Sequence, residues 1–164
     1  MIKKITFPKP EELLPHRAPM LLVDEIISYE PTVSLTASAN VAKDIPFFGG
    51  HFPGQPILPG IVLIEMMFQT CGLFGRIEMI GDEKTQNQNG EGKQFMGRAI
   101  KIDKTTFQHP VYPDETVQIK VTFDKKIMNF SVYKGVVTNE KGQTVAKGIA
   151  TVHIMEVEVE KNGK

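Results

Sequence analysis

The chain has 164 residues, the size of one domain, and its content of 41% hydrophobic and 8% aromatic residues is enough to build a core. The 19 basic and 19 acidic residues cancel, so the composition gives no reason to expect nucleic acid or an anionic membrane as a partner. The single cysteine, Cys71, excludes an intrachain disulfide framework and suits a reducing compartment. We therefore expect one globular domain over residues 1–164, located in the cytoplasm.

The amino terminus and the longest apolar stretch argue against export and against membrane insertion. The amino terminus has two lysines, but prolines and glutamates follow soon and no long apolar stretch does, so we expect no signal peptide. The longest apolar stretch, 57–74, predicts a buried helix rather than a membrane span. It is interrupted by Pro59, Gly60, Glu65, Gln69, Thr70 and Gly72.

Two strands and a long loop are predicted before this helix. Residues 19–30 are rich in branched side chains and end at the turn-like "EPT", which predicts a strand. Residues 33–42 alternate apolar and polar positions, which predicts a second strand in a hairpin with the first. Prolines keep residues 43–59 out of any regular element. Structured loops of that length in compact domains tend to carry function.

One buried helix followed by antiparallel strands is predicted for the rest of the chain. Residues 60–80 are apolar on nearly every face, as in a core helix, and the polar, glycine-punctuated residues 81–93 predict a surface loop. The strand-like segments that follow are "KQFMGRAIKID", "TTFQHPVYPDE", "TVQIKVTFD", "KIMNFSVYKGVVT" and, after a turn at "NEKG", "QTVAKGIATVHIMEVEVE". We read them as an antiparallel meander. The pattern predicts an α+β fold in which a curled antiparallel sheet wraps around a single long helix, with an edge strand suited to pairing with a second subunit.

Glu65 is the most anomalous residue, because its neighbours at 61–64 and 66–68 are all apolar. Burying an unpaired carboxylate costs several kcal/mol, so such a residue normally persists because it has a partner or a task. One interpretation is a functional carboxylate. The other is a structural carboxylate, satisfied by backbone amides or by an arginine such as Arg17 or Arg98. The residues alone leave both open.

The stretch "GGHFPGQPILPG" (49–60) holds His51 directly before the helix that carries Glu65. A lone histidine in a loop is more often a surface or hydrogen-bonding residue, and we keep that interpretation for His16, His109 and His153. His51 differs because prolines and glycines immobilise its loop, which delivers the chain to the helix start. Position and rigidity favour a functional role for it.

Pro59 and Gly60 suit a helix start, where free amides and the positive end of the helix dipole can polarise a carbonyl. Glu65 lies about one and a half turns further along, ~7–8 Å of rise, so a thioester carbonyl at Gly60 could present its β-carbon near Glu65. A base, an acid and an oxyanion site on an apolar helix are typical of proton abstraction beside a carbonyl with loss of a β-hydroxyl. A plain helix start is the alternative for these two residues.

Other chemistries find little support in the sequence. Metal-ligand clusters, phosphate loops and a Gly-x-Ser-x-Gly elbow are all absent from it. We therefore expect no metal and no cofactor.

Three blocks of the chain resemble the FabZ-type 3-hydroxyacyl-[acyl carrier protein] dehydratases. The blocks are "LLPHRAPMLLVDEI", "PFFGGHFPGQPILPGIVLIEMMFQTCG" and "TTFQHPVYPDETVQIKV", and the similarity runs from about Leu13 to His153. The resemblance implies a hot-dog fold, an acyl carrier protein as partner, and a homodimer whose active sites combine the histidine of one chain with the acid of the other. Such dimers often build trimers of dimers. The implied activity converts (3R)-3-hydroxyacyl-carrier protein to the trans-2-enoyl thioester, in fatty acid or related lipid or polyene synthesis.

The resemblance also assigns roles to residues. His51 matches the base that removes the α-proton, and Glu65 matches the acid that assists departure of the hydroxyl. The remaining residues expected to bind substrate or to orient the site are Gly60, which matches the backbone donor to the carbonyl, Ile57, whose carbonyl would orient His51, Gln69 beside Glu65, and Ala18, Met20 and Phe68 along the acyl path.

Several positions depart from the family pattern. Ala18 stands where the family commonly has an aromatic gate, and "FQHP" replaces a more basic stretch that helps to meet the carrier. FabA-type relatives, which also isomerise the double bond, usually carry aspartate where this chain has Glu65, so we expect dehydration alone. Two alternatives are a hot-dog acyl thioesterase and a non-catalytic acyl-thioester-binding partner subunit. The pair of His51 and Glu65 argues against both.

Overall fold

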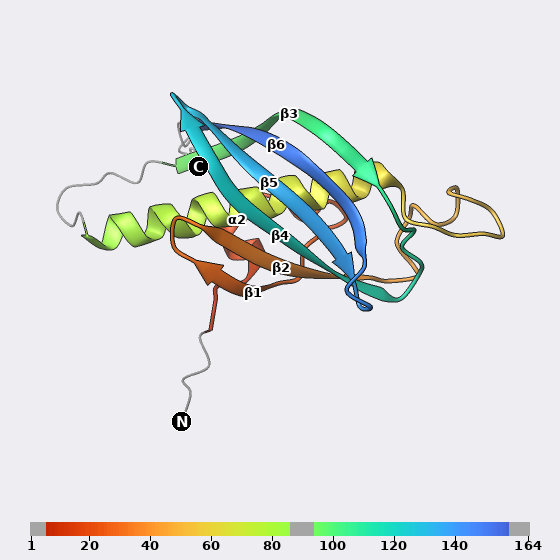
Figure 1. The fold of residues 1–164 in the computed structure, drawn as a ribbon. Coiled ribbons are helices and arrows are strands. Elements are labelled where there is room, and N and C mark those ends of the chain that lie inside the picture. The colour runs from red at the N-terminus through yellow and green to blue at the C-terminus, as the bar shows by residue number, and fades with distance from the viewer. Residues whose placement is uncertain (1–5, 86–93, 158–164) are drawn as a thin grey trace.

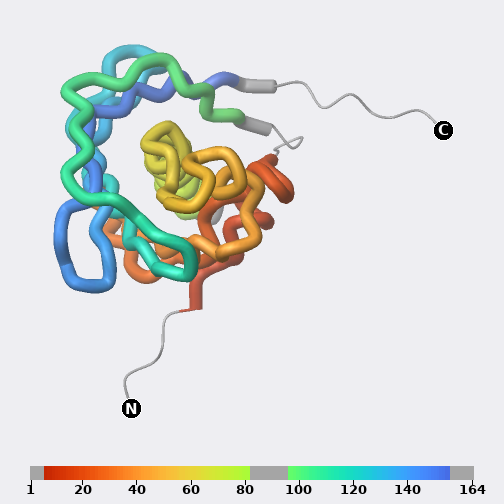
Figure 2. Tube along the Cα trace, turned by 90° about the vertical axis from the view of Figure 1, so that its right-hand side faces the viewer, coloured from red at the N-terminus to blue at the C-terminus, as the bar shows by residue number. Residues whose placement is uncertain are grey.

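A six-stranded antiparallel sheet curls around one long helix (Figures 1 and 2). The computed structural model describes residues 6–85 and 94–157. In chain order the elements are α1 (Pro10–Leu13), β1 (Glu25–Glu30), β2 (Ser34–Val41), α2 (Gly60–Thr85), β3 (Gln94–Phe107), β4 (Glu115–Ile127), β5 (Phe130–Asn139) and β6 (Thr144–Val157). The predicted α+β fold, with the sheet wrapped around a single long helix, is confirmed.

The strand order in the sheet is β1-β2-β4-β5-β6-β3. The predicted meander is confirmed for β4, β5 and β6, but it is wrong for β3, which pairs with β6 and forms the far edge of the sheet. Residues 108–114 carry the chain from one edge to the middle of the sheet, and Leu58, just before α2, donates its N–H to the Val111 carbonyl (2.8 Å). The two prolines of this connection, Pro110 and Pro113, lack the amide donors that a continuing hairpin needs.

The first predicted strand is too long at its start, because only Glu25–Glu30 is extended in the sheet. Residues 17–21 form a turn instead, in which the N–H groups of Met20 and Leu21 both bond the Arg17 carbonyl. The next amide, that of Leu22, donates to the Gln69 side chain rather than to a strand (2.9 Å). A side chain on α2 thus takes a donor that a strand would have used.

α2 begins at Gly60, as predicted, but continues to Thr85, so residues 81–85 of the expected surface loop are helical. Residues 86–93 of that loop lie outside the described part of the chain. The Gly60–Gly81 portion is long and apolar enough to cross a membrane, and half of the most apolar window is buried inside the protein. A core helix meets the same criteria, and Figure 2 shows the sheet curled around this one.

The strand segments of the second half also differ in their limits. β3 includes residues 94–103 of the first predicted segment and the start of the next one, but the strand ends at Phe107 and the rest of "TTFQHPVYPDE" is irregular up to β4. Its register against β6 shifts twice, between Ala99 and Lys101 and between Asp103 and Thr106. Such shifts bend a strand and increase its twist. Met128 and Asn129 form a turn that separates β4 from β5 within "KIMNFSVYKGVVT".

The core lies between α2 and the concave face of the sheet. Val117, Ile119 and Val121 of β4 are fully buried, whereas Gln118 and Lys120 between them are exposed, which is the alternation predicted for this strand. Close approach of the helix is possible because β5 has a glycine at its middle: a Cβ on Gly135 would come within 2.9 Å of the Met67 sulfur. The packed core thereby fixes the distance between α2 and the sheet, and with it the positions of the candidate site residues on α2.

Candidate active site

The proline-rich loop holds His51 by hydrogen bonds within the loop. The Ile57 N–H bonds the His51 carbonyl (3.0 Å), and the His51 ring nitrogen Nδ1 lies 3.0 Å from the Ile57 carbonyl oxygen. Between them, Phe52 and Gln55 exchange both of their backbone hydrogen bonds, which closes a tight turn around Gly54 (φ +79°). The imidazole is therefore fixed by the backbone of its own loop.

The Ile57 carbonyl also determines the tautomer of His51. A carbonyl oxygen only accepts, so the neutral ring must carry its proton on Nδ1 and donate it to Ile57. Nε2 is then left with a free lone pair. A general base needs such a nitrogen, in a fixed direction, within reach of the proton it removes.

His51 opens into a cavity of about 440 Å³ at the start of α2, together with Ile57, Gly60, Phe107 and other residues of the two loops. In the described part of the chain the Gly60 N–H has no hydrogen-bond acceptor. The first amides of a helix have no partner within the helix, and the dipole is positive there. The Phe107 ring covers one side of Gly60, only 2.8 Å from where a Cβ would stand. The structure thus places a candidate base and a free amide donor in one cavity.

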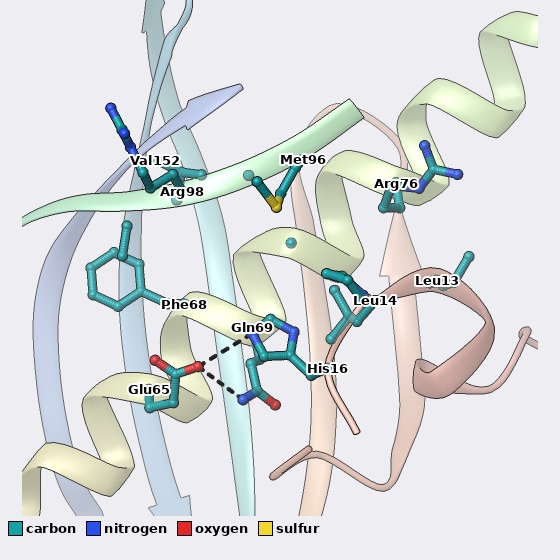
Figure 3. A pocket seen from close by; sticks show the side chains of 14 residues that line it. Leu13, Leu14, His16, Glu65, Phe68, Gln69, Arg76, Met96, Arg98 and Val152 are labelled. Carbon is teal, nitrogen blue, oxygen red and sulfur yellow. Dashed lines mark hydrogen bonds and ion pairs between the residues drawn. The ribbon is translucent and has the colours of Figure 1, made fainter. Parts of the chain in front are cut away.

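Glu65 lies in a different cavity, of about 240 Å³, between α2, the segment after α1 and β3 (Figure 3). Its side chain is 30% exposed, so the expectation of a buried carboxylate is wrong. The strands of the sheet do not cover this face of α2 completely, and the cavity reaches solvent there. Oε1 of Glu65 accepts a hydrogen bond from Nε2 of Gln69 (2.9 Å), one turn further along the helix.

Gln69 is itself held by three hydrogen bonds and is 1% exposed. Its amide nitrogen donates to the Met20 carbonyl (2.7 Å) as well as to Glu65, and its oxygen accepts from the Leu22 N–H. The amide cannot be flipped without breaking all three contacts, because donors and acceptor would exchange places. The donor side of Gln69 therefore faces Glu65.

His16 is the site residue that the sequence analysis missed. Its Nε2 lies 3.6 Å from Oε1 of Glu65, an ion-pair distance longer than a hydrogen bond. No local signal distinguishes His16 from the other histidines, apart from its place in the first of the three signature blocks. It reaches Glu65 only because the segment after α1 packs across α2.

The two arginines considered as partners of Glu65 do not pair with it. The Arg17 guanidinium bonds the carbonyls of Leu14 and His16 in its own segment (2.9 and 2.6 Å). Arg98 lines the cavity, but Figure 3 shows its guanidinium turned away from Glu65.

The remaining predicted residues divide between the two cavities or lie outside them. Phe68 lines the Glu65 cavity. Ala18 and Met20 line neither cavity and are exposed, although the Met20 carbonyl anchors Gln69. Within one chain His51 and Gly60 are thus together, and Glu65, Gln69 and Phe68 are together, but the two groups do not meet. The expectation that Gly60 and Glu65 face one substrate is not met inside the single chain.

Two further observations bear on cofactors and nucleophiles. No group of three or more His, Cys, Asp or Glu side chains in residues 6–85 and 94–157 could hold a metal ion. Cys71 is buried on α2, and burial raises the pKa of its thiol well above the usual range, which disfavours the nucleophilic thiolate.

A helix wrapped by an antiparallel sheet, with a backbone-locked histidine at its start and a glutamate on its exposed face, is the arrangement of a hot-dog acyl-thioester enzyme. The chain belongs to the FabA-like domain family, whose model matches residues 14–149. It is 40% identical over 127 residues to the 3-hydroxyacyl-[acyl-carrier-protein] dehydratase FabZ of Erwinia tasmaniensis, covering 77% of this chain and 78% of the relative. It is 41% identical over 125 residues to the FabZ of Klebsiella pneumoniae, with 76% and 77% coverage.

A solved structure supports the fold. The dehydratase heterocomplex ApeI:P from Xenorhabdus doucetiae superposes with a TM-score of 0.71 over 90% of this chain and 91% of that chain, at 20% identity. The hot-dog fold implied by the sequence resemblance is thereby confirmed.

Proposed function

We propose that this protein is a 3-hydroxyacyl-[acyl carrier protein] dehydratase, which converts the (3R)-3-hydroxyacyl thioester to the trans-2-enoyl thioester and water. The observation that carries the proposal is the orientation of His51: its Nδ1–H is bound to Ile57, which leaves Nε2 free on a ring that lines the same cavity as Gly60. The FabZ relatives, which are named for this activity, support it.

In the proposed reaction, Gly60 and His51 act at the carbonyl and the α-carbon, and Glu65 acts at the β-hydroxyl. The Gly60 N–H donates to the thioester carbonyl, which makes the α-hydrogen more acidic, and His51 Nε2 takes that proton. The electron pair left on the α-carbon forms the double bond as the β-carbon–oxygen bond breaks. Glu65 gives its proton to the departing hydroxyl, so that water leaves. Because this position is glutamate, we propose dehydration without isomerisation.

We propose further that the site is completed across a homodimer. In one chain His51 and Glu65 line separate cavities. Among the strands of the described residues, β3 pairs only with β6, and it carries the exposed apolar residues Met96 and Ile100. An unpaired edge with apolar side chains is suited to pairing with a second copy across a two-fold axis. His51 of one protomer would then face Glu65 of the other, and the dimers would assemble further into trimers of dimers.

Carrier-borne substrates and a cytoplasmic location complete the proposal. The acyl chain would lie along the apolar walls of the Glu65 cavity, with Phe68 among them. An acyl thioesterase remains the second enzymatic candidate. It would release free thiol from the same substrates, which the assay below detects.

The test is the reverse reaction, hydration of crotonyl, octenoyl and dodecenoyl thioesters followed by loss of the enoyl absorbance. We expect turnover by the wild type, no free thiol and no 3-enoyl isomer, and a loss of at least about a hundredfold in His51→Ala and in Glu65→Gln. Substantial activity in either variant, or thiol release in place of hydration, would overturn the assignment.

Mixing the two inactive variants tests the shared site. If each site takes one residue from each protomer, random re-assortment of subunits forms one intact site in every heterodimer. Activity should then return to about one quarter of the wild type, because half of the dimers are mixed and each has one working site of two. No recovery after verified subunit exchange would place both residues within one protomer.

A further inference from the structure

The two contacts to Glu65 meet on a single oxygen. Nε2 of Gln69 lies 2.9 Å and Nε2 of His16 lies 3.6 Å from Oε1, and none of the described residues forms a hydrogen bond or an ion pair with Oε2. Figure 3 shows both dashed lines ending on that oxygen, with the other oxygen pointing away from them. The two oxygens of this carboxyl group are therefore not equivalent.

The orientation of Gln69 fixes the nature of the first contact. Its amide oxygen is occupied by the Leu22 N–H, so its nitrogen faces Glu65 and can only donate. An oxygen that accepts this N–H is disfavoured as the site of the acid's own proton, because two hydrogens would then face each other.

The surroundings of His16 fix the nature of the second contact. Nδ1 of His16 is buried and has no hydrogen-bond partner in the described residues. A proton on Nδ1 would be a buried donor without an acceptor, and such donors are rarer in proteins than unsatisfied acceptors. The favoured ring thus carries its proton on Nε2, which points toward Oε1 of Glu65.

We propose that His16 is a positioning residue for the acid, and that together with Gln69 it keeps Oε1 of Glu65 as an acceptor so that the transferable proton is carried on Oε2. This inference rests on the proposed dehydratase activity. In dehydration the Oε2 proton passes to the β-hydroxyl oxygen, the carbon–oxygen bond breaks and water leaves. The carboxylate that forms gains negative charge on Oε1, where the hydrogen bond from Gln69 (2.9 Å) and the electrostatic attraction of the more distant His16 N–H (3.6 Å) stabilise it.

The two histidines of the site would then be opposite tautomers. His51 carries its proton on Nδ1, which frees Nε2 as a base, whereas His16 carries its proton on Nε2, which directs an N–H at the acid from 3.6 Å. One ring is oriented by a carbonyl of its own loop, and the other by the absence of an acceptor at Nδ1 within the described residues. The same residue type is thus prepared for two tasks.

The first experiment reads the tautomers directly, by long-range nitrogen–hydrogen NMR correlation on the full-length protein with labelled histidine. His16→Gln and His51→Ala spectra assign the signals. We expect a protonated Nε2 at His16 and a protonated Nδ1 at His51. A protonated Nδ1 at His16 would overturn the inference, and this readout does not depend on whether the proposed activity exists.

The second experiment measures hydration kinetics for His16→Phe, which keeps a ring without a donor, and His16→Gln, which returns an amide donor. We expect kcat to fall about tenfold in His16→Phe with KM changed less than threefold, and His16→Gln to recover most of the loss. The matched control is His153→Phe, since His153 stacks on Phe130 and lines neither cavity; its kinetics should match the wild type. Wild-type kcat in a folded His16→Phe, or an equal loss in His16→Gln, would refute the role. An inactive wild type would instead refute the proposed function.

Discussion

Replacing Gln69 with leucine tests whether its three hydrogen bonds hold the site segment onto α2. Leucine has a similar volume, so the main change is loss of the bonds to Leu22, Met20 and Glu65. A typical internal hydrogen bond contributes about 1 kcal/mol net. The greater hydrophobicity of leucine at this buried position offsets part of the loss. We therefore expect the free energy of unfolding to fall by about 2–3 kcal/mol, a large fraction of the 5–15 kcal/mol typical of domains.

The assay is urea denaturation followed by circular dichroism, at one fixed protein concentration because association contributes to stability. Gln118→Leu is the matched control: it makes the same chemical change on β4, where Gln118 is exposed, and should shift stability by less than about 0.5 kcal/mol. If Gln69→Leu were as stable as this control, the three bonds would contribute nothing net. The segment that carries His16 would then be held by apolar packing alone.

Three other changes probe the helix start, the core and the acyl path. Gly60→Ala should lower hydration kcat/KM by about tenfold, because the new methyl group must displace the Phe107 ring 2.8 Å away; unchanged kinetics would show that the ring moves aside freely. The buried Cys71 thiol, with its raised pKa, should resist iodoacetamide at pH 8 in the folded protein and react after unfolding, and mass spectrometry of the intact chain would reveal any native-state labelling against this. Ala18→Tyr should narrow chain-length tolerance across the enoyl thioester series; an identical profile would remove Ala18 from the acyl path.

Local patterns predicted most elements, because the signals that define them are local. Alternation along β4 predicted a half-buried strand, and Pro59 predicted the beginning of α2. The strand predicted over 19–30 was wrong only in its part before Glu25, for a reason that no local pattern contains: the Leu22 amide bonds a side chain 47 residues away. The same limit applies to β3, whose partner is the last strand of the chain rather than the next one.

The candidate site likewise contains residues that a local sequence signal reveals and one that it does not. His51 and Glu65 were found because each is anomalous among its sequence neighbours. His16 is ordinary in its own segment, and only the packing of that segment across α2 brings its ring to Glu65. The split of His51 and Glu65 between two cavities could not come from composition or periodicity. The family resemblance implies a site shared by two chains, and that implication stays a prediction.

The position of α2 in the chain has a consequence during synthesis. The helix contacts β2, β3, β4, β5 and β6, and four of these strands, β3 to β6, are encoded after it. A nascent chain that has emerged only as far as residue 85 therefore has an apolar helix with just one of these five strands, β2, available to cover it. Domains fold as units once their last elements emerge, and exposed apolar surface before that point favours aggregation. The nascent chain should accordingly be most dependent on chaperones between the appearance of α2 and the completion of β6.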